Sequence, residues 1–151
     1  MCVLRAGGPD FDVDTFLATS PFEICGVRRK GELRFRSKPD GPRNSSSGFN
    51  ADVSTKEWSD LAGQIQDAKG FLSENAEELR RLRSFPGVAG VEMDFPIELR
   101  IGRNEIVVQS DRLPADMLLA AGELGIDIVI SLYPPAEDDC GLNGDDREGT
   151  I

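Results

Sequence analysis

The sequence predicts an α+β fold, with a single, mostly antiparallel sheet and helices packed on one face of it. Runs with helical apolar spacing are interspersed with several short β-branched or alternating runs, which indicates hairpins as well as helices. A strand–helix–strand pattern also occurs near both ends of the chain. A chain of 151 residues is typically one domain and is long enough to bury its own core.

The clearest elements are a helix and a strand near the C-terminus. Pro114 suits a first helical turn, and Gly125 suits the left-handed residue that ends a helix. Leu119 widens the apolar face, so we expect it to face the core. The strand that follows, Ile126–Tyr133, is rich in β-branched residues and stops at two prolines. The helical face is formed by Met117, Leu118, Ala121 and Leu124.

A similar pattern lies near the N-terminus. Residues 111–129 align without a gap on residues 9–27. Each helix is preceded by a strand candidate, Cys2–Leu4 or Ile106–Val108. We therefore expect two strand–helix–strand units, which would form a ferredoxin-like pseudo-repeat if both are right-handed. The alternative is that any two amphipathic helices followed by strands would align equally well.

The elements of the first half follow from local signals. Asp12 is a good N-cap for a short helix, and Ser20-Pro21 ends that helix. Residues 38–47 are rich in turn-forming residues and predict a loop. The expected elements are strand Met1–Ala6, helix Val13–Thr19, strand Phe22–Val27, the alternating strand Glu32–Arg36 and strand Gly48–Val53.

The middle of the chain predicts two helices and two strands. Ser54 and Glu57 have the spacing of a capping box, which would start a helix carrying Trp58. We expect Gly70 to break that helix and Ser73 to cap the next one. The chain then predicts a helix end at Pro86-Gly87, a long strand Val88–Leu99 with Pro96 at an edge or bulge, a turn at Gly102-Arg103-Asn104, and a strand Glu105–Gln109.

Charge is distributed unevenly along the chain. The net charge is −10, and residues 137–151 carry six acidic residues against one arginine. These last residues contain little that could pack into a core. We therefore predict a single α+β domain over residues 1–136 and a disordered acidic tail over residues 137–151.

The cysteines and the apolar runs indicate the compartment. Cys2, Cys25 and Cys140 are odd in number and widely spaced, which argues against a disulfide framework and for a reducing environment. Cys25 lies in an apolar stretch and is expected to be an inert core thiol. We see neither a secretory signal nor an apolar run of membrane-spanning length, so we expect a cytoplasmic protein without a membrane partner.

The chain from Val3 to Tyr133 resembles the bacterial family catalogued as domain of unknown function 4279. The resemblance is carried by Thr15-Phe16-Leu17, by Arg29-Lys30-Gly31, by Val53-Ser54 with Leu61 and Ile65, and by Leu124–Ile128 with Tyr133. It implies a small bacterial α/β domain without an established activity, and it assigns no catalytic residue. The acidic tail and the serine-rich loop near Ser45 depart from that pattern.

Several chemistries are excluded or disfavoured. The chain has no histidine, which excludes Ser–His–Asp and Cys–His mechanisms within one chain and histidine-based zinc sites. Asp10–Asp14 resembles the start of a calcium loop, but Thr15 and Pro21 occupy the required Gly and Glu positions, which favours helix capping. Glu92 and Asp94 share a strand face and could do acid–base work, or could simply be solvated. We predict no catalytic residue, metal site or cofactor.

The one positive feature is a basic cluster. We nominate Arg28, Arg29, Lys30, Arg34 and Arg36 as binding residues, and Lys38 and Arg43 lie nearby. The cluster could be a solvated edge, a site for an acidic protein or ligand, or a weak RNA-binding hairpin, since Lys30-Gly31 and Phe35 echo an RNA-recognition strand. The acidic chain argues against nucleic acid.

The composition and the cluster together suggest a function. We expect a non-enzymatic bacterial domain that binds a protein partner through an anionic surface of that partner, in an immunity-type or regulatory role. The alternatives are a small-ligand sensor, an enzyme whose site is built from carboxylates and arginines, and weak RNA binding through residues 28–36. A homo-oligomer is compatible with the sequence.

Overall fold

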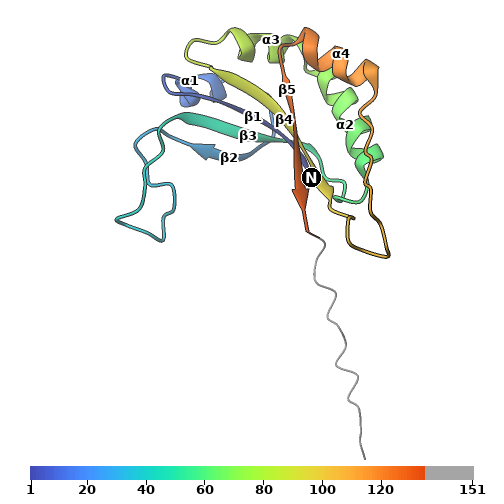
Figure 1. Ribbon diagram of the computed structural model, residues 1–151. Coiled ribbons are helices and arrows are strands. Elements are labelled where there is room, and N and C mark those ends of the chain that lie inside the picture. Colours follow the sequence, from blue (N-terminus) through green and yellow to red (C-terminus); the bar gives the residue numbers. More distant parts are fainter. Residues whose placement is uncertain (135–151) are drawn as a thin grey trace, which may run out of the picture.

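The computed structural model describes residues 1–134, which form one five-stranded sheet and four helices (Figure 1). The helices lie together on one face of the sheet, and the other face is open (Figure 1). The elements are β1 (Cys2–Gly8), α1 (Val13–Leu17), β2 (Ile24–Arg28), β3 (Ser47–Ser54), α2 (Leu61–Glu74), α3 (Ala76–Ser84), β4 (Gly90–Glu98), α4 (Ala115–Glu123) and β5 (Asp127–Tyr133).

The strand order is β2-β3-β1-β4-β5, and every neighbouring pair is antiparallel except β4 and β5. This confirms the α+β fold with a mostly antiparallel sheet. β1 lies in the middle of the sheet and alternates, because successive side chains of a strand point to opposite faces. Leu4 and Ala6 are buried under the helices, whereas Arg5 belongs to the open face.

Aromatic side chains join α1 to the sheet. The Phe16 ring stacks on Phe49 of β3 with ring centroids 5.6 Å apart, and both residues are fully buried. The Arg81 guanidinium of α3 lies 4.2 Å from the centre of the Phe16 ring. Asp12 caps α1 by accepting hydrogen bonds from the backbone and the hydroxyl of Thr15, as its position before the helix predicted. These contacts hold a helix of five residues that is too short to be stable alone.

The expected pseudo-repeat is not confirmed. Residues 106–108 form no strand, and the side chains of Val107 and Val108 are 84% and 72% exposed. The strand before α4 is β4, and β5 occupies the side of β4 that residues 105–109 would have needed. β4 and β5 are direct neighbours, whereas β3 separates β1 from β2. Residues 2–27 therefore contain a strand on each side of the helix, whereas residues 104–129 have a strand only after it.

The alternating stretch 32–36 is also not a strand. Only Leu33 forms an isolated antiparallel bridge, with Arg43 on the returning side of the same loop. An alternating pattern becomes a strand only when a neighbouring strand pairs with its backbone. Arg34 and Arg36 therefore do not share a strand face.

The boundaries of α2 and α3 differ from the predicted ones. Asp60, rather than Ser54, caps α2 by accepting a hydrogen bond from the Gly63 amide at 2.9 Å. Ser54 ends β3, and Trp58 lies before the helix with its ring stacked on Tyr133. Gly70 continues α2, and the break comes at Asn75. One central glycine costs a helix only about 1 kcal/mol, which packing at Leu72 and Ala68 outweighs.

The position of α4 in the sequence agrees with the prediction, but the face that the helix buries differs from the predicted one. α4 follows Pro114, and Gly125 with a φ of +67° ends it, as expected. Met117 and Ala121 are buried, but Leu118 is 44% and Leu119 is 62% exposed. The prediction that Leu119 faces the core is wrong, because α4 packs mainly against α2 and β5 and buries a narrower stripe.

The two described cysteines lie in different surroundings. Cys2 of the central strand is fully buried, and burial together with the nearby Asp94 carboxylate raises the pKa of its thiol to about 12. Cys25 of the edge strand β2 is exposed, so the prediction of a core thiol is wrong. Cys140 and the predicted acidic tail lie outside the described residues. Within residues 1–134, no helix combines the length and apolar character needed to cross a bilayer.

Candidate functional site

The basic cluster divides into cations that meet acidic side chains and cations that do not. Arg29 binds Asp14 of α1 through two nitrogens, with Nε 2.9 Å from Oδ2 and Nη2 2.7 Å from Oδ1. These hydrogen bonds lower the pKa of Asp14 and raise the pKa of Arg29. Lys30 Nζ lies 3.8 Å from Asp10. Two of the five nominated residues are therefore engaged within the chain.

Three arginines line one hollow in the loop region between β2 and β3. Arg28, Arg34 and Arg43 surround a space of about 330 Å³, which we call the arginine hollow. No acidic residue lines it. Arg28 and Arg34 were nominated from the sequence, and the structure brings Arg43 to them. The remaining lining residues are Asn44, Ser45 and Ser46.

Backbone hydrogen bonds close the loop that carries these arginines. The Gly31 amide donates to the Asn44 carbonyl at 2.8 Å, and the Arg34 amide donates to the Pro42 carbonyl at 2.9 Å. Arg43 Nη1 donates to the Gly31 carbonyl at 2.7 Å. The loop therefore folds back on itself, which places Arg43 beside Arg34 although nine positions separate them in sequence.

Arg36 is not part of the hollow. Its side chain is exposed, and it lines none of the hollows that involve the other arginines. Its neighbour Phe35 is 50% exposed, and the cationic groups of Arg34 and Lys38 each lie 5.8 Å from the Phe35 ring centre. The structure therefore separates Arg36 from Arg28, although the sequence placed both in one cluster.

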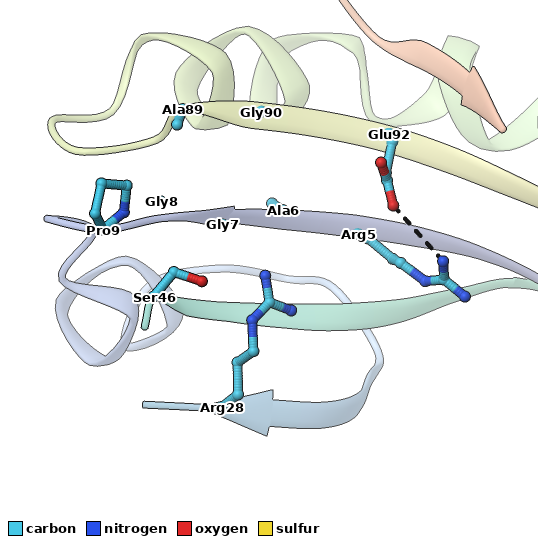
Figure 2. Close-up of a pocket in the computed structure, with 10 residues that line it drawn as sticks. All are labelled: Arg5, Ala6, Gly7, Gly8, Pro9, Arg28, Ser46, Ala89, Gly90 and Glu92. Atoms are coloured by element: carbon cyan, nitrogen blue, oxygen red, sulfur yellow. Dashed lines mark ion pairs between the residues drawn. The ribbon is translucent and has the colours of Figure 1, made fainter. Parts of the chain in front are cut away.

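The Arg28 side chain lies over two glycines of neighbouring strands, Gly48 and Gly7, which we call the glycine floor. Its Cα partner across the β2–β3 ladder is Gly48, and Gly48 in turn faces Gly7 of β1. Figure 2 shows the Arg28 side chain rising from β2 across β3. A Cβ atom at Gly48 would lie 2.7 Å from Arg28 Nη2 and would displace the guanidinium. The missing side chains of Gly7 and Gly48 thus let Arg28 lie flat on the sheet.

A second hollow of about 350 Å³ is lined by Gly7 together with Gly8 and Gly90, and we call it the glycine hollow (Figure 2). Arg28 and Ser46 line both hollows. Arg5, on the far side, is already bound, with Nη2 2.6 Å from Asp94 Oδ2 and Nη1 3.6 Å from Glu92 Oε1. Arg28 is partly buried, yet within residues 1–134 its guanidinium has neither an ion pair nor a hydrogen bond.

This arrangement can bind an oxyanion. A guanidinium presents five N–H donors in a plane and matches a carboxylate or phosphate with two parallel hydrogen bonds. Arg34 and Arg43 add positive charge, and the Ser45 and Ser46 hydroxyls can donate as well. Glu92 and Asp94, the two carboxylates considered for acid–base work, both pair with Arg5. Asp94 is 2% exposed and is held by Arg5 and by the Ser131 hydroxyl at 2.7 Å.

The acidic stretch 10–14 has a structural role. Asp12 caps α1, while Asp10 and Asp14 bind Lys30 and Arg29. Among the described residues no group of three or more histidine, cysteine or acidic side chains could hold a metal ion.

Sequence reasoning missed half of the hollow. Asn44, Ser45 and Ser46 lie in a stretch assigned to a loop from composition alone, and Arg43 was counted in the cluster without a role. The only sequence signal for them is the nearness of Arg43 to the other cations. Which arginines remain unpaired depends on where α1 places Asp14, and no local pattern contains that information.

No family model, no curated protein and no solved structure matches this chain. The resemblance to the family of unknown function therefore stays a prediction.

Proposed function

We propose that this chain is a protein-binding domain that holds an acidic segment of its partner in the arginine hollow. The observation that carries this proposal is the state of Arg28. It is partly buried, it has no anionic partner within residues 1–134, and it shares a hollow with two further arginines and no acid. A cytoplasmic bacterial protein with a regulatory or immunity-type role would fit such a domain.

Leaving the Arg28 guanidinium unpaired costs free energy. A charged group that is partly removed from water loses hydration, and an anion that pairs with it restores those interactions. A hydrogen bond to a charged group contributes about 1.5–3 kcal/mol. The sheet and the glycine floor hold Arg28 in place before the ligand arrives, so binding costs less side-chain entropy there.

We favour a protein segment over nucleic acid because of the few aromatic residues in the loop and the net charge of the chain. Proteins that bind single strands stack successive bases on several aromatic side chains. Phe35 is the only aromatic residue between Arg28 and Ser46. The chain also carries a net charge of −10, which repels a polyanion such as RNA at long range. A short acidic peptide segment can enter the hollow with little exposure to the rest of that charge.

Fluorescence anisotropy with a fluorescein-labelled hexaglutamate peptide tests the proposal. We expect Arg28→Gln to weaken binding about tenfold or more, the equivalent of one lost charge-assisted hydrogen bond. Arg36→Gln is the matched control, because it removes the same charge a few residues away outside the hollow. We expect it to change the affinity less than about threefold.

Three further results would contradict the proposal. Equal losses in Arg28→Gln and Arg36→Gln would mean that only the overall charge matters. Tighter binding of a labelled hexauridylate than of hexaglutamate would favour RNA. Inhibition by free glutamate or inorganic phosphate at concentrations as low as those of unlabelled hexaglutamate would favour a small-ligand sensor.

A further inference from the structure

β5 leaves one side of its backbone without a partner strand. It is the last strand in the sheet order, and β4 pairs with it on one side only within residues 1–134. It is seven residues long, and its register with β4 runs without a shift from end to end. An edge of this kind offers a row of free N–H and C=O groups to another strand.

Within the described part of the chain, β5 itself contains no lysine, proline or bulge that would block strand addition. Natural edge strands are protected by lysines, prolines, bulges or a covering segment. Within β5 the only charged residue is Asp127, and there is neither a lysine nor a proline. Ile130 and Leu132 are 43% and 56% exposed. Leaving such residues in water is unfavourable, and burying them would be favourable.

We propose that β5 pairs antiparallel with β5 of a second copy of this chain, around a two-fold axis at Ile130. A second copy suits this edge because β5 complements itself in this register. Ile130 would face Ile130, Ile128 would face Leu132, and Asp127 would face Tyr133. The two Asp127 carboxylates never meet, so pairing causes no repulsion between like charges along the strands.

The neighbouring helix complements itself as well. α4 packs on β5 and, on its inner side, against α2, so it is the outermost helix at this edge (Figure 1). A two-fold axis perpendicular to the sheet keeps both helix layers on one face and brings the two α4 helices together. Leu118 and Leu119, which are 44% and 62% exposed, would then be covered. An interface between identical subunits is of this self-complementary kind.

The oligomeric state tests the proposal directly. Sedimentation-velocity runs from about 1 to 200 μM, a range that covers typical weak dimers, should show a concentration-dependent dimer of the full chain. Ile130→Lys should abolish it, because the two new ammonium groups would face each other across the axis. Val107→Lys is the control, since Val107 is 84% exposed and belongs to the loop before α4 rather than to β5 or α4.

Cross-linking tests the register. In a Cys25→Ser, Cys140→Ser background, Ile130→Cys should form a disulfide-linked dimer on mild oxidation, because facing residues of antiparallel strands lie about 4.5–5.5 Å apart. Leu132→Cys should not, because its two copies would be offset along the strands.

A monomer at all concentrations would overturn the proposal, whether or not β5 binds some other strand. A dimer that survives Ile130→Lys, one that Val107→Lys also abolishes, or equal cross-linking at both cysteines would do the same. None of these results depends on the arginine hollow, so each proposal is tested independently of the other.

Discussion

Arg5 Nη2 lies 2.6 Å from Asp94 Oδ2 and neutralises a carboxylate on β4 that is 2% exposed. Arg28, on the same open face, has no such partner within residues 1–134. The two arginines differ because the strand opposite Arg5 presents acidic residues, whereas the strands beneath Arg28 present glycines. One arginine therefore stabilises the sheet, and the other is available to a ligand.

Removing the Arg5 side-chain charge should destabilise the fold. We expect Arg5→Met to cost about 1–3 kcal/mol of the free energy of unfolding, because it leaves the buried Asp94 carboxylate with the Ser131 hydroxyl alone. Glu92→Gln is the control, since the Glu92 side chain is 41% exposed and lies 3.6 Å from Arg5, and it should cost under about 1 kcal/mol. Urea denaturation measures both. Equal losses would show that Asp94 gains nothing from Arg5.

Two identical substitutions test the helix orientations. Leu82→Ala in α3 removes a fully buried side chain and should cost about 2–5 kcal/mol. Leu119→Ala in α4 removes one that is 62% exposed and should cost under about 0.5 kcal/mol at concentrations where the chain is monomeric. Urea denaturation of both variants at low micromolar concentration is the measurement. A larger loss for Leu119→Ala would restore the orientation of α4 predicted from sequence.

Asp14 should make the stability depend on pH. Its pKa in the folded protein is lowered by the hydrogen bonds from Arg29, so its stabilising effect is present above its ordinary pKa near 3.8 and is lost as the pH falls through the lower folded value. The stability difference between the wild type and Asp14→Asn should therefore shrink between pH 6 and pH 2.5, as measured by urea denaturation.

Arg29→Gln provides the check on the cause. In this background Asp14→Asn should show little pH dependence, because the donor that lowers the Asp14 pKa is gone. A pH dependence that persists unchanged in the Arg29→Gln background would mean that another group is responsible.

Local signals predicted the elements that local chemistry determines. Asp12 capped α1, Gly125 ended α4, and the β-branched run after it became β5. The wrong predictions concern stretches whose conformation depends on contacts with residues far away in the sequence. Residues 32–36 alternate like a strand and residues 105–109 contain a β-branched run, but within the described part of the chain neither stretch belongs to a strand of the sheet. Gly70 stays helical because the residues around it pack on the core.

The candidate site was predicted in composition but not in geometry. Its cations were visible in the sequence, and Arg28 and Arg34 do meet in one hollow. The sequence could not show that Asp14 and Asp10 approach Arg29 and Lys30 from α1. It also could not show that the loop folds back and places Arg43 beside Arg34. In both cases the residues are separated in sequence, and only the tertiary fold brings them together.

The most direct test of the central claim follows the arginine Nε–H resonances of the full chain by NMR while unlabelled hexaglutamate is added. The proposal predicts that the signal of Arg28 shifts most and that those of Arg34 and Arg43 shift with it in one saturable transition. The signals of Arg36 and of Arg5, which is bound to Asp94, should stay nearly unchanged. No shift at Arg28, or equal shifts at Arg28 and Arg36, would contradict an acidic-segment site in the arginine hollow.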